Sequence, residues 1–146
     1  MKKLQSFAQL FLRLALGIGY LVPALDRLGA WGKNGQPGIS WGDWQHFVQY
    51  AGEVMGFIPH ALVIPFAEIA TIAEISFGIL LVLGKYTKLA AIGSGVLALL
   101  FAISMAISFG IVSPLSYSVF TVSAASFLLA TIDQYNWSLD NLRFSK

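Results

Sequence analysis

The chain has 146 residues, of which 57% are hydrophobic and only 11% are charged, and its mean hydropathy is +0.73. Soluble domains carry about 25% charged residues, so the composition excludes an ordinary soluble domain and favours an integral membrane protein. The net charge of +2 comes from basic residues scattered at the ends of apolar segments, which argues against nucleic-acid binding, and the lack of cysteine excludes disulfides and thiol chemistry.

Four apolar runs are long enough to cross a bilayer, because a spanning helix needs about 20 residues. They cover approximately residues 7–28, 60–83, 89–109 and 115–132, and the connections between the last three are short. Short connections make consecutive helices antiparallel. The sequence therefore predicts a single all-α membrane domain over residues 1–146, an integral membrane four-helix up-down bundle.

The first run contains an arginine among apolar residues. The two lysines before it resemble the start of a secretory signal, but its length and Arg13 favour a retained membrane span. Small and polar residues also recur at helical spacing along this run, and the small ones permit close approach of a neighbouring helix. This stripe consists of Arg13, Gly17, Tyr20, Ala24 and Arg27.

The segment between the first two runs divides into two parts. Its first half is rich in Gly, Asn and Pro and predicts a loop. In its second half, apolar residues recur at helical spacing and Gln45, Gln49 and Glu53 take the opposite face. This pattern predicts a short amphipathic helix over approximately residues 43–57, lying on the outer membrane surface. Trp44 and two further tryptophans anchor the loop in our preferred interpretation, and the alternative is ligand contact.

Two carboxylates fall inside the second run. Glu74 and Arg13 would each lie roughly 12–14 Å into the bilayer, counted from the cytoplasmic ends of their helices. Because a lone charge at such depth costs at least ~2.5–3.5 kcal/mol, we predict a buried Arg13–Glu74 ion pair, either a structural brace or a functional pair. Glu68 has no evident basic partner at its depth, which favours a functional role.

The placement of basic residues predicts the orientation. With the N-terminus inside, six lysines and arginines lie on the cytoplasmic side and only Arg27 and Lys33 lie outside. The sequence therefore predicts a multi-pass protein of the bacterial inner (cytoplasmic) membrane with both termini in the cytoplasm.

Catalytic signals are weak. The two histidines, His46 and His60, fall near the outer surface without a ligand-spaced cluster, so we predict no metal site. No phosphate-binding glycine loop and no nucleophile motif is present. The chain alone is therefore not expected to be a complete enzyme.

Three motifs resemble the DoxX family of bacterial membrane proteins: "RLALG" in the first run, a glutamate followed by "GILLVLG" in the second, and the turn "KYTKLAA". The resemblance implies a four-helix inner-membrane bundle that serves a membrane-associated redox system, with Arg13 and Glu74 at the family's arginine and glutamate positions. The sequence departs from the family at Asp26-Arg27, where Gly and Lys are usual, and in the third run, which lacks a histidine.

Three functions follow as alternatives. The first is an accessory or quinone-facing subunit, in which a quinone would contact Tyr20, Arg27, Glu68 and Trp44 beneath the aromatic loop. The second is a membrane scaffold that docks a soluble partner on the surface helix. The third is a small transporter or proton pathway that depends on Glu74 or Glu68. The expected partners are the lipid bilayer and a soluble redox subunit, and an oligomer is left open.

Overall fold

The computed structural model describes residues 2–143, and these contain helices and connecting loops but no strand. Three helices are long and apolar enough to cross a membrane, and a shorter apolar helix follows them. The helices are α1 (Lys2–Asp26), α2 (Trp44–Val54), the 3-10 helix η1 (His60–Leu62), α3 (Val63–Leu83), α4 (Thr87–Phe109), α5 (Val112–Ser116), α6 (Val119–Ala130) and α7 (Leu139–Arg143).

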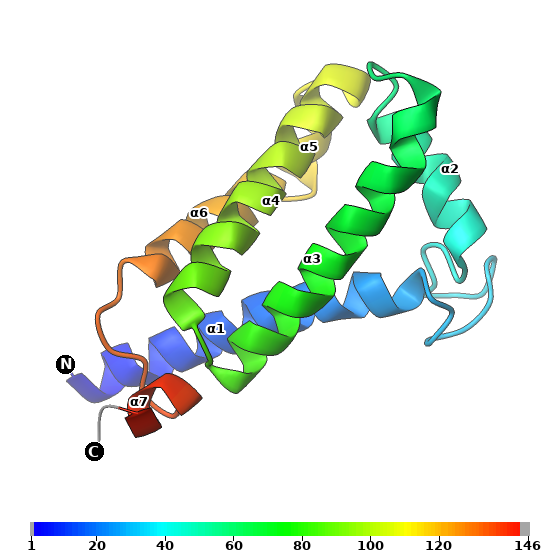
Figure 1. The fold of residues 1–146 in the computed structure, drawn as a ribbon. Helices are drawn as coiled ribbons and strands as arrows, with labels where there is room; N and C mark the ends of the chain where they lie inside the picture. The colour runs from blue at the N-terminus through cyan, green and yellow to red at the C-terminus, as the bar shows by residue number, and fades with distance from the viewer. Residues whose placement is uncertain (1, 144–146) are drawn as a thin grey trace.

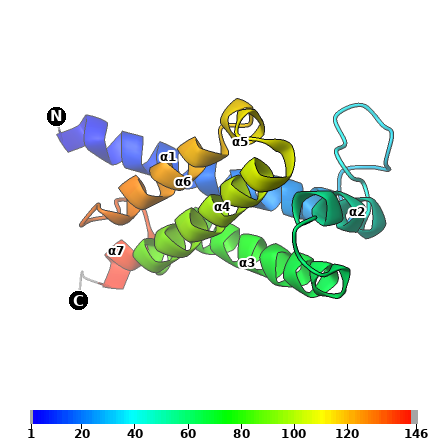
Figure 2. The ribbon, with the colours of Figure 1, turned by 90° about the horizontal axis from the view of Figure 1, so that it is seen from above.

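The long helices pack side by side, with α1 mainly against α3 and α6 mainly against α4 (Figure 1). The start of α1 and helix α7 lie at one end of the molecule, which we call the proximal end. Helix α2 lies away from it, beside the start of α3, and we call that end distal (Figures 1 and 2).

Glycines bring α1 and α3 into close contact. A Cβ atom at Gly17 would lie 2.8 Å from Val82 Cγ2 and 3.0 Å from the Gly78 carbonyl oxygen. A Cβ atom at Gly78 would meet Leu21 Cγ at 2.7 Å. Only residues without a side chain fit at this distance, as the small residues of the predicted stripe indicated.

The register between α1 and α3 differs from the one that we expected. Arg13 lies beside Gly84, at the turn that ends α3, and Arg27 lies beside Thr71 near the middle of α3. Helix α1 therefore runs past the proximal end of α3 by about three turns. Those extra turns pack against the C-terminal segment, where Gln9 Nε2 donates to the Asn136 carbonyl at 3.0 Å.

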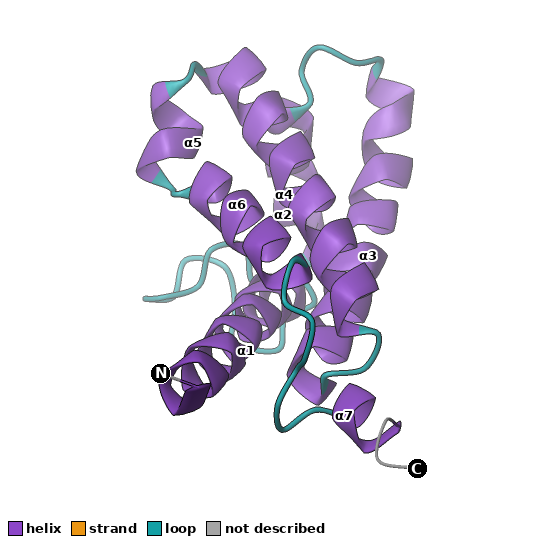
Figure 3. Cartoon of the chain, turned by 90° about the vertical axis from the view of Figure 1, so that its left-hand side faces the viewer, coloured by secondary structure: helices purple, strands orange, loops and turns teal. Residues whose placement is uncertain are grey.

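The fourth apolar run, predicted as one helix over residues 115–132, is interrupted. Helix α5 ends at Ser116, and α6 begins after Ser118, whose φ of 57° places it in the left-handed region (Figure 3). The serines on either side of Tyr117 are weaker helix formers than Leu or Ala, because their hydroxyls compete for backbone hydrogen bonds. The prediction of a continuous fourth helix was therefore wrong.

Helix α2 confirms the predicted amphipathic helix but is shorter than residues 43–57. Asp43 is its N-cap and accepts the backbone N–H of His46, and Met55 is its C-cap. Its buried residues are Phe47, Ala51 and Val54. They face the start of α3 and the end of α4, where Ser108 Oγ donates to the Val54 carbonyl at 2.8 Å. Helix α2 thus covers the part of α3 that α1 does not reach.

Candidate functional site

The described residues contain one buried ion pair between an arginine and a carboxylate, and it is not the predicted one. Arg27 Nη2 lies 2.8 Å from Glu74 Oε2, and both side chains are almost completely buried. The predicted Arg13–Glu74 pair is wrong because α1 runs past the end of α3, which carries Arg13 to the proximal turn and brings Arg27 to the level of Glu74. The stripe itself is confirmed, since Arg13, Tyr20, Ala24 and Arg27 are all buried.

The remaining donors of Arg27 are also engaged. Its Nη1 donates to Thr71 Oγ1 at 2.9 Å, and that hydroxyl donates to the Ala67 carbonyl. Its Nε donates to the Pro23 carbonyl at 3.2 Å. A buried guanidinium needs such partners, because leaving a buried charge uncompensated costs several kcal/mol. The contacts fix Arg27 between α1 and α3.

Aromatic rings cover the guanidinium of Arg27. Its Cζ atom lies 3.8 Å from the ring centroid of Phe47 and 5.2 Å from that of Trp41. Trp44 packs on Phe47 with a centroid distance of 5.4 Å. Because a cation over an aromatic face is attracted by the ring's quadrupole, these contacts tie α2 to α1 and α3.

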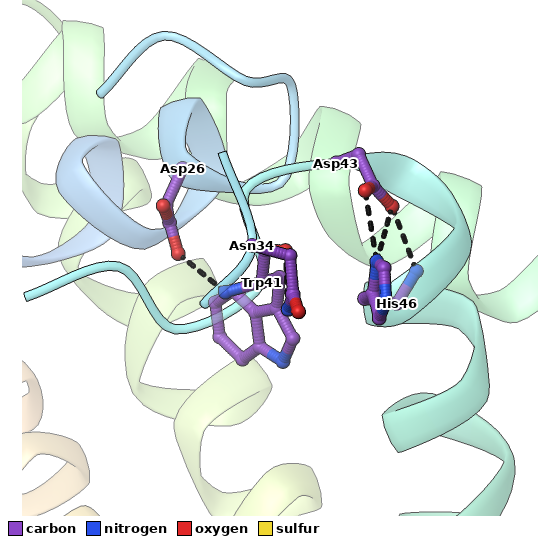
Figure 4. A network of polar contacts seen from close by, with 5 residues as sticks. All are labelled: Asp26, Asn34, Trp41, Asp43 and His46. Atoms are coloured by element: carbon purple, nitrogen blue, oxygen red, sulfur yellow. Dashed lines mark hydrogen bonds and ion pairs between the residues drawn. The ribbon is translucent and has the colours of Figure 1, made fainter. Parts of the chain in front are cut away.

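The neighbouring residue Asp26 fixes the loop before α2. Asp26 is buried, and its Oδ2 accepts the backbone N–H groups of Ser40 and Trp41 at 3.0 and 2.9 Å. Figure 4 shows the contact with Trp41. Asn34 Nδ2 donates to the Trp41 carbonyl, which closes the loop from its other side. We call the set Asp26, Arg27, Trp41, Phe47, Thr71 and Glu74 the distal node. It holds a surface loop and a helix against two long helices.

A second polar cluster surrounds Arg13 at the proximal end. The Arg13 side chain is 2% exposed, and its Nη2 donates to the Trp137 carbonyl at 2.7 Å. Its Nε and Nη1 have no hydrogen-bond partner in the part of the chain that the structure describes. Asp140, whose negative charge acts on Arg13, accepts the backbone N–H groups of Tyr86 and Thr87 at the start of α4.

The four residues predicted to bind a quinone do not form one site. Arg27 and Trp44 share contacts with Phe47 at the distal node. Tyr20 belongs to a different buried cluster, and its hydroxyl donates to the Ser94 carbonyl at 2.8 Å. Glu68 lies on the exposed face of α3. Glu68 therefore lies outside the buried polar contacts between the helices, and its functional role stays a prediction.

Four members of the distal node were not predicted as site residues from the sequence. Thr71 precedes Glu74 by three positions on α3, so helical spacing could have indicated it, whereas Asp26 is adjacent to Arg27 and does not follow that spacing. Phe47 was predicted to lie on the apolar face of the amphipathic helix, and Trp41 was among the loop tryptophans. Their contact with Arg27 depends on how the loop folds back, and no local pattern signals it.

The histidines do not form a metal centre within the described residues. His46 Nδ1 lies 2.8 Å from Asp43 Oδ2 on the exposed start of α2 (Figure 4), and His60 is exposed in η1. No group of three or more His, Cys, Asp or Glu residues in residues 2–143 could hold a metal ion.

No protein-family model, no curated protein and no solved structure matches this chain. The resemblance of its motifs to the DoxX family therefore stays a prediction, and the site has to be interpreted from its own geometry. Within the distal node, Arg27 and Glu74 compensate each other's charge inside the protein. Such an arrangement is suited to fixing the positions of helices, and it could exchange a proton only if Arg27 moved away from Glu74.

Proposed function

We propose that the chain is a DoxX-like integral membrane protein of the bacterial inner membrane. In this proposal it is an accessory subunit that presents α2 on the outer side to a soluble redox partner. The observation that carries the proposal is the distal node, in which Arg27 contacts Glu74 of α3 and Phe47 of α2 at once. A subunit that docks a partner benefits from a rigid docking element, and the node makes α2 rigid.

The exposed apolar surface supports the membrane placement. Large aliphatic side chains point outward along α3 and α4, and contiguous exposed apolar surface of this extent is unusual in soluble monomers. They include Ile69, Ile72, Leu89, Leu100 and Ile107. Lys85 lies in the α3–α4 turn and Lys88 in the first turn of α4, both at the proximal end. Because basic residues are in excess on the cytoplasmic side of membrane proteins, we assign this end to the cytoplasm.

The polar face of α2 supports the docking role. Gln45, His46, Gln49 and Glu53 are exposed, while the opposite face of the helix is buried against α3 and α4. The redox character of the partner rests on the family resemblance alone. A quinone is the alternative occupant, and its ring would pack near Trp41 and Trp44, beside the guanidinium of Arg27.

The proposal is tested by purifying the tagged protein from its native membranes in mild detergent and analysing the complexes by native mass spectrometry. A triple variant, Gln45→Ala, Gln49→Ala and Glu53→Ala, removes polar contacts from α2 without touching its buried face. Glu68→Gln is the matched control, because it alters an exposed carboxylate on α3. We expect a soluble subunit that carries a redox cofactor to co-purify with the wild type and the control, and to be lost from the triple variant.

Two results would contradict the proposal. A bundle that carries only phospholipid would remove the evidence for any partner. A redox subunit that the triple variant retains would place the docking surface elsewhere than α2. A retained ligand of quinone mass, without a protein partner, would favour the quinone-facing alternative.

A transport function is the second candidate, and the interruption of the fourth helix is the observation that favours it. Transporters place broken helices at their ion sites, and the break at Tyr117–Ser118 divides α5 from α6. A proton pathway through Glu74 would give proton flux in liposomes that Glu74→Gln abolishes. Absence of flux in the wild-type protein would exclude this candidate.

A further inference from the structure

A groove at the proximal end lies where the first turns of α1 meet the C-terminal segment. Its volume is about 550 Å³, and it is lined by Lys3, Ser6, Phe7, Asn136, Trp137 and Asn141. Hydrogen bonds hold its two walls together, since Asn136 Nδ2 donates to Ser6 Oγ at 2.7 Å and Gln9 Nε2 donates to the Asn136 carbonyl. The groove is therefore a feature of the packed structure and is distinct from the distal node.

The residues that line this groove are suited to bind a molecule that has both an anionic group and apolar chains. It offers the ammonium group of Lys3 and the side-chain amide of Asn141 as donors, together with two aromatic rings, and none of the described residues that line it has a carboxylate side chain. An adjacent pocket of about 220 Å³ has the opposite character, because Asp133 and Asp140 line it. The two neighbouring sites thus differ in the sign of their charge.

Arg13 adds positive charge behind the wall of the groove. Its guanidinium is buried and donates to the carbonyl of Trp137, one of the lining residues. Two of its three nitrogens have no hydrogen-bond partner among the described residues. Asp140 offsets part of this charge, but its carboxylate also accepts two backbone N–H groups of the α3–α4 connection and the start of α4.

Trp137 has an unfavourable backbone conformation that leaves its ring at the surface. Its φ of 52° lies in the left-handed region, which is uncommon for a bulky residue, and its side chain is 65% exposed. Strained residues of this kind persist where the surrounding structure holds them, and they are concentrated at functional sites. Here the hydrogen bond from Arg13 to the carbonyl fixes the residue.

The free face of α1 next to the groove is apolar. Leu4, Phe7 and Phe11 are strongly exposed and follow one another at helical spacing. Exposed apolar and aromatic residues beside lysines are typical of a surface at the boundary between lipid headgroups and acyl chains. In the membrane orientation proposed above, this boundary lies at the cytoplasmic leaflet, which carries anionic lipids.

We propose that the groove binds the headgroup phosphate of an anionic phospholipid. Lys3 and Asn141 contact the phosphate oxygens, Trp137 and Phe7 flank the glycerol region, and the acyl chains run along Leu4 and Phe11. The proposal uses the membrane placement of the proposed function, but it depends on neither the redox assignment nor the docking role of α2.

The test uses the full chain in neutral detergent and measures lipid binding by native mass spectrometry. Phosphatidylglycerol and phosphatidylcholine with the same acyl chains are titrated separately, and inorganic phosphate is added as a competitor. We expect phosphatidylglycerol to bind more tightly than phosphatidylcholine, and Lys3→Gln to weaken it about fivefold, since one basic residue near an anionic surface contributes about that factor. Lys88→Gln is the matched control, because Lys88 is exposed near the same end but does not line the groove.

A second variant separates binding from folding. Trp137→Gly removes the ring and relaxes the left-handed backbone, so we expect an unchanged or higher melting temperature together with weaker phosphatidylglycerol binding. Three results would overturn the proposal. They are equal affinity for the two lipids, equal losses in Lys3→Gln and Lys88→Gln, and full displacement of the lipid by millimolar inorganic phosphate, which would indicate a site for free phosphate.

Discussion

Two buried arginines lie on the same face of α1, and the protein satisfies them in different ways. Arg27 is paired with Glu74, bonded to Thr71 and covered by Phe47. Arg13 is equally buried, but within residues 2–143 its side chain has a single hydrogen bond, to a backbone carbonyl. The difference follows from position, because Arg27 lies within the contact between α1 and α3, whereas Arg13 lies where α3 has already ended. A charged side chain inside the α1–α3 interface needs a charged partner. A charged side chain at the edge of that interface can instead donate to backbone carbonyls of the segment that covers it.

The largest effect is expected from removing the acid of the distal node. Glu74→Leu leaves Arg27 buried without the carboxylate that it is paired with, and breaking a buried pair costs about 3–5 kcal/mol. We expect a correspondingly large loss in the free energy of unfolding, measured by chemical denaturation in detergent. The double variant Arg27→Met, Glu74→Leu removes both charges and is expected to recover most of the stability. A double variant as unstable as Glu74→Leu would contradict the pairing.

A smaller effect is expected at the proximal arginine. Arg13→Met removes one hydrogen bond to a charged donor, which contributes about 1.5–3 kcal/mol. In double-mutant cycles, Arg13 and Glu74 are expected to be additive to within ~0.5 kcal/mol, whereas Arg27 and Glu74 are expected to be coupled. Strong coupling between Arg13 and Glu74 would instead support the ion pair that was predicted from their equal depth in the bilayer.

Between Arg13 and Arg27, α1 packs closely on α3, and this helix contact sets the register of the two helices. Gly17→Ala places a Cβ atom against Gly78 and Val82, and overpacking of this kind costs about 1–3 kcal/mol. We expect a loss at the lower end of this range, because one methyl group is added. Gly19→Ala is the matched control, since a Cβ atom there has no neighbour within 4 Å. Equal melting temperatures for the two variants would show that α1 and α3 do not require this close approach.

The local patterns of the sequence predicted the helices well. Apolar length indicated the three long helices, and helical spacing indicated both the buried stripe of α1 and the amphipathic α2. These features depend only on residues close together in the chain. The interruption at Ser118 was missed, because Pro114 precedes it by four residues and residues 115–121 contain neither proline nor glycine.

The partner of each buried charge was not predictable in the same way. Counting residues from assumed membrane boundaries gave Arg13 and Glu74 equal depths, but α1 extends beyond α3 and shifts that register by about four turns. Gln9 lies four positions before Arg13 on the same face of α1 and contacts the C-terminal segment. It was a signal that the buried stripe begins before Arg13, but its partner lies at the far end of the sequence.

The smallest effect on stability is expected from a substitution at the N-cap of α2. It tests whether the contacts of the distal node are sufficient to keep this helix in place. Asp43 accepts the backbone N–H of His46, and this bond, supported by the His46 ring, lowers the pKa of the Asp43 carboxyl. Because the pKa of Asp43 is lower in the folded state, its carboxylate stabilises the fold fully at pH values above its unfolded-state pKa of about 3.9. This stabilisation is lost as the pH falls through the folded-state pKa of Asp43.

Asp43→Asn keeps a capping oxygen but cannot titrate, and Asp43→Ala removes the cap. We expect hydrogen exchange of the α2 amides, corrected for intrinsic rates, to rise slightly in Asp43→Ala at neutral pH and to stay near the wild-type level in Asp43→Asn. Below the pKa of Asp43, the exchange of the wild type should approach that of Asp43→Ala. Complete loss of protection in Asp43→Ala would contradict the role of Arg27 and Phe47, because a helix anchored by the distal node should keep its position when its cap is removed.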